Sequence, residues 1–191
     1  MTILRVVDIE TTGTDPTEHA IVEIAATDVH PERRSAGQTF AHLVKPPHPI
    51  PPEAMAVHHI LDEDVADAAQ ANEVVPLVLV PDDEPIYVAH NAAFEMGFLA
   101  PWLPDAQWLC TYKATLRVWP EAPSHSNQVL RYWLGIQVLA GEPHRAGPDT
   151  IVTARILLKL LEKASIEDML AWTKEPPVMP RITIGEHRGK P

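Results

Sequence analysis

Short apolar runs, each closed by charged or turn-forming residues, dominate the first half of the chain and predict β-strands. The first run ends in Asp8-Ile9-Glu10 and is followed by a turn over residues 11–16. Further strands are expected at residues 21–29, 39–44, 86–89 and 108–110. Because the first three strands follow one another with no helix between them, they predict an antiparallel meander.

The second half of the chain carries apolar residues at helical spacing. Gly147-Pro148-Asp149 opens the clearest helix, since proline suits the first helical position, and residues 165–168 form a capping box for another. Ile151, Ala154, Leu158 and Leu161 line one side of the clearest helix, away from Arg155, Lys159 and Glu162. Helices are expected at residues 53–60, 65–79 (kinked or ended by Pro76), 93–102, 113–119 and 127–135, and from 147 and 166 onward. This order of elements predicts an α/β fold with a mixed sheet flanked by helices.

Composition narrows the class of protein. The chain has 191 residues, 46% of them hydrophobic, which suits one globular domain. Its 15 basic and 26 acidic residues give a formal net charge of −11. This charge argues against a protein that binds many phosphates along an extended surface, but it allows one that holds a few nucleotides through metal ions. No apolar run approaches the roughly 20 residues of a membrane span. The single cysteine, Cys110, excludes an internal disulfide, and we expect a cytoplasmic protein with no membrane partner.

Four acids and one histidine are the candidate functional groups. Asp8 and Glu10 lie two residues apart on a strand, so both side chains project from one face. Glu95 and Asp149 each lie at a predicted helix start, where an acid also complements the helix dipole. Each acid alone fits an ordinary structural role. Together with His144 they predict an oxygen-rich site for Mg²⁺ or Mn²⁺, with the imidazole placed to accept a proton from an attacking water.

Three short motifs carry a resemblance to the DEDDh exonucleases, the DnaQ-like branch of the RNase H-like superfamily. Residues 8–13 read Asp-Ile-Glu-Thr-Thr-Gly and resemble the first motif. Residues 90–95 resemble the second, H-N-A-x-F-D, and residues 144–149 resemble the third, H-x-A-x-x-D. Residues 50–58 resemble the loop before the second motif in DNA polymerase III epsilon subunits and in the exodeoxyribonuclease X group. Residues 108–111, 126–127 and 183–190 are similar to the exodeoxyribonuclease X group in particular, so the resemblance covers nearly the whole chain.

The resemblance implies an RNase H-like fold over residues 1–173, in which an antiparallel meander is followed by parallel strands. It also implies 3′→5′ removal of nucleotides from single-stranded DNA or DNA 3′ ends as 5′-monophosphates, by a two-metal-ion mechanism, with a polymerase or repair protein as a possible partner. In this interpretation His144 is the general base, and two Mg²⁺ or Mn²⁺ ions are held by Asp8, Glu10, Glu95 and Asp149. The residues expected to contact the substrate are Thr11, Thr12, His90 and Asn91.

The chain departs from the family pattern most clearly at Glu95, where the family has aspartate. One added methylene moves the carboxylate by roughly 1 Å, and a misplacement of that size can cost about a hundredfold in rate. We therefore expect reduced but real activity, with Mn²⁺ tolerated better than Mg²⁺. Thr150 stands where relatives have alanine and is expected in a partly wet site, and His59 stands where many have glycine. Residues 174–191, proline-rich and then basic, are interpreted as a tail, the stub of a truncated module.

Two alternatives to a DNA exonuclease stay open. The same motifs suit an RNA-trimming DEDDh exonuclease, because discrimination depends on how the site treats the 2′-hydroxyl. The substitution at Glu95 also suits a weakly active or inactive subunit that only binds nucleic-acid ends.

Overall fold

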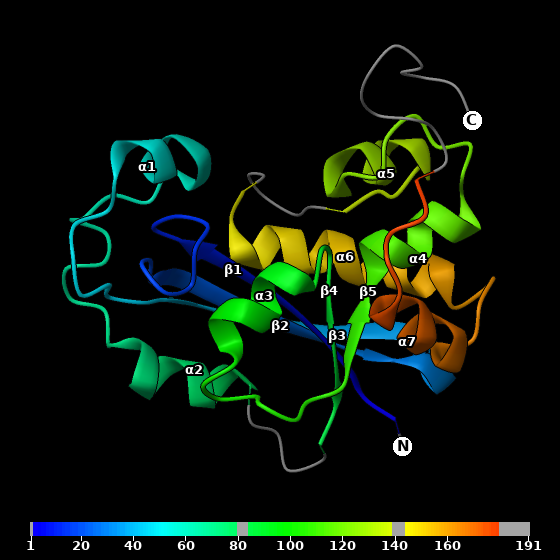
Figure 1. The fold of residues 1–191 in the computed structure, drawn as a ribbon, viewed down its shortest axis with the longest axis horizontal. Coiled ribbons are helices and arrows are strands. Elements are labelled where there is room, and N and C mark those ends of the chain that lie inside the picture. Colours follow the sequence, from blue (N-terminus) through cyan, green and yellow to red (C-terminus); the bar gives the residue numbers. More distant parts are fainter. Residues whose placement is uncertain (1, 80–83, 139–143, 180–191) are drawn as a thin grey trace.

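One five-stranded sheet with helices on both faces makes up the described part of the protein (Figure 1). The computed structural model describes residues 2–79, 84–138 and 144–179. The strands are β1 (Leu4–Thr11), β2 (Ile21–His30), β3 (Ser35–Leu43), β4 (Ile86–Ala89) and β5 (Trp108–Cys110). The helices are α1 (Pro52–His58), α2 (Ala71–Leu79), α3 (Ala93–Leu99), α4 (Thr111–Val118), α5 (Asn127–Trp133), α6 (Ala146–Leu160) and α7 (Ile166–Lys174).

The sheet has the strand order β3-β2-β1-β4-β5. The first three strands pair antiparallel, whereas β4 pairs parallel to β1 and β5 pairs parallel to β4. The predicted mixed sheet, a meander followed by parallel strands, is therefore confirmed. In the β1–β2 register Glu10 lies opposite Glu23, which places a third acid beside the two that end β1.

Two hydrophobic layers lie on the two faces of the sheet, because alternate residues of a strand point to opposite faces. Val7 and Ile9 of β1 pack with buried residues of α2 and α3. Leu4 and Val6 pack with the buried face of α6 and with residues of α4 and α7. Asp8 therefore continues the face of β1 that meets α6.

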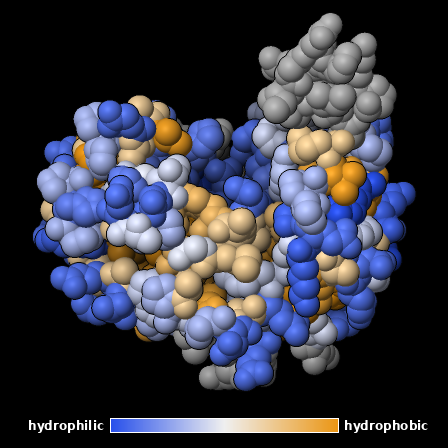
Figure 2. Space-filling view, in the orientation of Figure 1, coloured by the Kyte–Doolittle hydropathy of each residue, from blue (hydrophilic) through white to orange (hydrophobic). Residues whose placement is uncertain are grey.

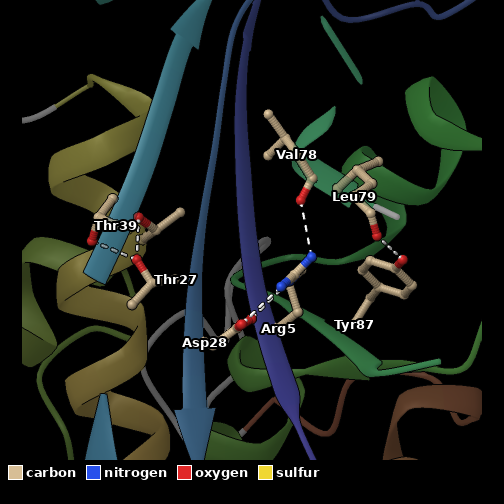
Figure 3. A network of polar contacts seen from close by, with 8 residues as sticks. Arg5, Thr27, Asp28, Thr39, Val78, Leu79 and Tyr87 are labelled. Carbon is tan, nitrogen blue, oxygen red and sulfur yellow. Dashed lines mark hydrogen bonds and ion pairs between the residues drawn. The ribbon is translucent and has the colours of Figure 1, made fainter. Parts of the chain in front are cut away.

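A row of threonine hydroxyls joins α6 to the meander. The hydroxyls of Thr27 and Thr39, on β2 and β3, are 2.7 Å apart (Figure 3). Thr27 donates to Thr150 at 3.0 Å, and Thr150 donates to the carbonyl of Gly147 at 2.7 Å. Thr150 is fully buried, so the expectation that it lies in a partly wet site is wrong. Its hydroxyl instead fixes the first turn of α6 against the sheet.

Arg5, at the start of β1, anchors the end of α2 (Figure 3). Its guanidinium pairs with Asp28 on β2 through two contacts of 2.7 Å and donates to the carbonyl of Val78 at 3.1 Å. Tyr87 donates to the neighbouring carbonyl of Leu79. The last carbonyls of a helix have no partner within the helix, so these two side chains satisfy the end of α2.

Several helix boundaries differ from the prediction. The second helix begins at Ala71 instead of residue 65, because residues 65–70 form turns and a bridge from Gln70 to Lys45, and it continues past Pro76 to Leu79. The third ends at Leu99, three residues early. His59 ends α1 with φ at +59°, a left-handed conformation that glycine adopts without strain and that explains the glycine of relatives.

The described chain reaches residue 179, so most of the predicted tail, residues 180–191 with the similar segment 183–190, lies outside the described residues. Ser165 caps α7 as predicted, accepting the amide of Asp168 at 3.0 Å. No described helix combines the length and apolar character needed to cross a bilayer.

Candidate active site

Three carboxylates meet where β1 ends and α6 begins. One oxygen each of Asp8, Glu10 and Asp149 lies within 4.8 Å of the other two. Strand alternation puts both β1 acids on the face that α6 covers, and Asp149 lies in the first turn of α6. Figure 2 shows a hollow between the part of the molecule that carries α1 and the part that carries α5, with hydrophilic residues on its floor.

The fourth predicted acid, Glu95, lies beside this group but outside its 4.8 Å limit. It occupies the first turn of α3 and is only 3% exposed. Its Oε2 is buried and has no hydrogen-bond partner among the described residues. A buried carboxylate oxygen without a donor is costly unless it is protonated or faces a cation, so this atom fits a bound metal ion.

Crowding and burial oppose ionisation throughout the cluster. Burial is the main cause that raises the pKa of Glu10 to about 8, and the charges of Asp149 and Glu23 add to it. Burial likewise raises the pKa of Glu95 to about 8. The pKa of Asp8 is raised well above its usual value by burial and then by Glu95 and Glu10. Such a cluster binds either protons or divalent cations.

Metal-free protein is therefore expected to lose stability as the pH rises from about 5 to about 8. Glu10 and Glu95 hold protons in the folded state that the unfolded chain has already released in this interval, so deprotonation favours unfolding. A divalent ion replaces those protons, and its effect on the Tm should grow over the same interval. Thermal melts in EDTA and in MnCl₂ between pH 5 and 8.5 measure both effects. The Glu10→Gln variant, which lacks one of the carboxylates, serves as the comparison with a weakened site. An equal rise in Tm on adding MnCl₂ at pH 5.5 and at pH 8 contradicts the prediction.

Asp149 is held by one donor on each oxygen. Gln128 of α5 donates its amide to Oδ1 at 2.8 Å, and the backbone N–H of His144 donates to Oδ2 at 2.9 Å. The carboxylate is thus oriented before any ion binds. Sequence reasoning missed Gln128, because nothing local distinguishes it from a surface glutamine of a short helix.

Glu23 and Arg145 fasten the start of α6 to the sheet. Glu23 is 4% exposed and accepts Nε of Arg145 at 3.0 Å and Nη2 at 2.7 Å. It also accepts the backbone N–H of Ala146 at 2.8 Å. Sequence reasoning missed this pair, although an acid inside an otherwise apolar strand was a usable signal, because buried charges are normally paired.

His144 lies directly before this anchor, at the rim of the site. Its backbone has φ at +59°, and its side chain is exposed. The bond from its N–H to Asp149 places the backbone of His144 next to the carboxylate cluster. The ring has no polar partner among the described residues, so it is free to meet a water or a substrate.

The first motif turn uses the hydroxyls of Thr11 and Thr12 within the protein. Thr11 donates to the carbonyl of Gly13 at 2.6 Å, and Thr12 accepts the amide of Ala20 at 3.0 Å. The ring of His19 packs where a Cβ on Gly13 would stand, so any larger residue there would have to displace this ring. Both threonines are buried, and the substrate contact predicted for them stays a prediction.

The second motif begins with His90, which joins three segments of the chain. Its Nδ1 lies 2.9 Å from the hydroxyl of Thr111 and its Nε2 lies 2.8 Å from the carbonyl of His125. Burial lowers the pKa of His90 to about 4, so the ring is neutral at pH 7 and donates from Nε2. Asn91, by contrast, is exposed with φ at +87°. The substrate contacts of both residues stay predictions.

Comparison with known proteins bears on this arrangement. Residues 6–157 match the exonuclease family described by the RNase_T model. The chain belongs to the DEDDh exonuclease family. Among DEDDh relatives, exodeoxyribonuclease 10 of Escherichia coli (strain K12) is 36% identical over 193 residues, covering 98% of this chain and 83% of that protein.

Solved structures agree with this assignment. Exonuclease X in complex with 5′ overhanging duplex DNA has a TM-score of 0.77 and 34% identity, and the match covers 89% of this chain and 99% of the other. The nuclease domain of 3′hExo, a DEDDh family member bound to rAMP, has a TM-score of 0.70 at 19% identity, covers 85% of this chain and 92% of the other, and supports the fold alone. The chain is thus a 3′→5′ exonuclease with an RNase H-like fold, from a family that depends on divalent metal ions.

Proposed function

We propose that this exonuclease acts on DNA, removing nucleotides from the 3′ end and releasing nucleoside 5′-monophosphates. The observation that carries the chemistry is the meeting of Asp8, Glu10 and Asp149 beside the unpartnered Oε2 of Glu95. The choice of DNA is supported by the 36% identity to an exodeoxyribonuclease and by the likeness to exonuclease X bound to duplex DNA.

The donor set fits two divalent ions. Hard cations such as Mg²⁺ and Mn²⁺ take carboxylate oxygens, and the four acids would hold them. When bound, such ions stabilise the charge on the attacking and leaving oxygens of a phosphodiester displacement. Gln128 keeps Asp149 oriented as a ligand, and the imidazole of His144 takes the proton of the attacking water.

A competition assay tests the proposal. Matched 3′-labelled DNA and RNA oligonucleotides are mixed with the protein and Mn²⁺, and released mononucleotides are counted. The proposal expects release of 5′-monophosphates from DNA in preference to RNA. Preference for RNA supports the RNA-trimming alternative, and tight binding of 3′ ends without release supports an end-binding subunit; either result overturns the proposal.

Replacing Glu95 by aspartate is expected to raise turnover by about ten- to a hundredfold with Mg²⁺, because the shorter side chain restores the carboxylate position of the family. The gain should be smaller with Mn²⁺. The exposed Glu73→Asp is the matched control, expected to leave the rate unchanged. A parent protein that is faster than the Glu95→Asp variant contradicts the idea that the longer side chain misplaces the carboxylate.

Replacing His144 by glycine is expected to lower kcat by about a hundredfold or more, the usual contribution of a general base. Because the side chain is exposed, free imidazole can reach the vacated place and should restore part of the rate. A His144→Gly variant that keeps more than a tenth of the parent rate, or that free imidazole does not stimulate, argues against His144 as the base.

A further inference from the structure

A basic pocket lies outside the carboxylate cluster, on the exposed side of α6. Its volume is about 450 Å³, and Arg34, Arg155 and Lys159 line it, with Glu162 among the other lining residues. Arg34 ends the short turn between β2 and β3, and Arg155 and Lys159 lie four residues apart on α6. Three cations around one pocket are unexpected in a chain with a formal net charge of −11.

These three charges are not used inside the described part of the protein. The arginines that form ion pairs there are Arg5, Arg117 and Arg145. Within the ranges 2–79, 84–138 and 144–179, the side chains of the pocket cations form no ion pair and no hydrogen bond, and all three are exposed. Clustered exposed cations without internal partners attract an external anion.

The basic pocket and the active site share helix α6. This helix carries Asp149 in its first turn, and it rises about 1.5 Å per residue, so Arg155 and Lys159 lie about 9 and 15 Å further along its axis. A nucleic-acid strand that leaves the carboxylates in this direction would reach the two cations within a few nucleotides.

A second pocket adjoins the basic pocket on the side of α5. Ile136 and Gln137 line both the basic pocket and a neighbouring pocket of about 530 Å³ that also contains Arg131 and Tyr132. Arg131 contacts the side chain of Gln128 at 3.4 Å, the residue that orients Asp149. Tyr132 is 75% exposed with the guanidinium of Arg131 5.4 Å from its ring centre. Exposed aromatic rings between cations are typical of surfaces that bind single-stranded nucleic acid.

We propose that the basic pocket binds backbone phosphates of the strand being degraded, a few nucleotides from the cleaved bond. This inference rests on the proposed exonuclease function. The pocket binds a longer substrate without contacting the reacting phosphate. Its positive charge also offsets locally the negative net charge of the chain, which repels nucleic acid.

Two substrates of different length distinguish phosphate binding in the basic pocket from hydrolysis at the carboxylates. The p-nitrophenyl ester of thymidine 5′-monophosphate occupies only the carboxylate site, whereas a 20-nucleotide DNA strand extends beyond it. Arg155→Glu is expected to raise KM for the 20-mer about tenfold and to leave hydrolysis of the ester within twofold of the parent. The dependence of DNA affinity on salt should become shallower by about one unit in the log–log slope. Lys174→Glu, an equal charge change at an exposed residue at the end of α7, should alter neither the KM for the 20-mer nor the salt dependence.

Three results for Arg155→Glu overturn the inference. The first is an equal loss of activity on both substrates, and the second is an effect on the 20-mer no larger than that of Lys174→Glu. The third is unchanged affinity for DNA together with lost affinity for an acidic peptide. Arg155→Gln repeats the test with a smaller perturbation, and thermal melts show that each variant is folded. If the parent hydrolyses neither substrate, the proposed function fails. Anisotropy of labelled DNA in EDTA then still tests the pocket on its own.

Discussion

Replacing Asp149 by asparagine is expected to lower kcat on DNA by about a thousandfold at saturating metal. A bound divalent ion contributes several kcal/mol of charge stabilisation, and each 1.4 kcal/mol corresponds to about a tenfold change in rate. Asparagine keeps the size of the side chain and can still accept the amide of Gln128, but its NH₂ group cannot accept the backbone N–H of His144, so the loss reports the missing charge together with one hydrogen bond. Release of mononucleotide from a 3′-labelled strand, titrated with Mn²⁺, measures the effect.

Asp149→Asn is also expected to change the stability of the protein, in the direction opposite to its effect on activity. Because burial raises the pKa of Asp149 and its charge raises that of Glu10, asparagine should make the metal-free protein more stable at pH 8. Asp105→Asn, at an exposed position outside the site, is the matched control and should change neither activity nor Tm. A variant that keeps more than a tenth of the parent rate would remove Asp149 from the proposed ligand set.

Replacing Glu23 by glutamine is expected to lower kcat about a hundredfold although Glu23 is not itself a predicted ligand. The neutral side chain cannot pair with both nitrogens of Arg145 and the amide of Ala146, so the start of α6 shifts. Displacements of about 1 Å cost this much in rate. Breaking a largely buried ion pair from one side should also lower the free energy of unfolding by about 3 kcal/mol, or the Tm by roughly 6–12 °C.

A positioning role for Glu23 predicts that kcat falls while KM for the small ester changes little. Measurements are made well below the Tm of the variant, so that loss of folded protein does not imitate loss of rate. Exposed Glu18→Gln serves as the control. If Glu23→Gln reduced stability but retained the parent kcat, Glu23 would have no effect on the geometry of the site.

The elements that sequence analysis predicted best are those whose pattern is local. The runs ending at Glu10 and Val29 and the capped start at Ser165 contain their own signals, and the structure confirms them. The start of α2 was misplaced because apolar residues from Val65 onward suit a helix equally well, and only the bridge to Lys45 decides otherwise.

The buried face of α6 is likewise not predictable from local sequence. The apolar residues Ile151, Leu158 and Leu161 lie on a partly buried flank, whereas Val152, Ile156 and Leu160 are fully buried. A helix that packs across three strands is apolar on most sides, so its inward face cannot be read from spacing. The candidate site acids could be predicted because family motifs mark them, whereas Glu23 and Gln128 contact partners more than a hundred and about twenty residues away in sequence, which no local pattern shows.

The distribution of the site along the chain determines when it can form during synthesis. A growing polypeptide that has emerged only as far as the end of α5 contains Asp8, Glu10 and Glu95, but neither Asp149 nor the Arg145 anchor for Glu23. Domains fold as units once enough of their sequence is available. If the proposed ligand set is correct, a fragment that ends before α6 lacks Asp149 and should hydrolyse no nucleic acid, so activity is expected only after α6 has packed on the sheet.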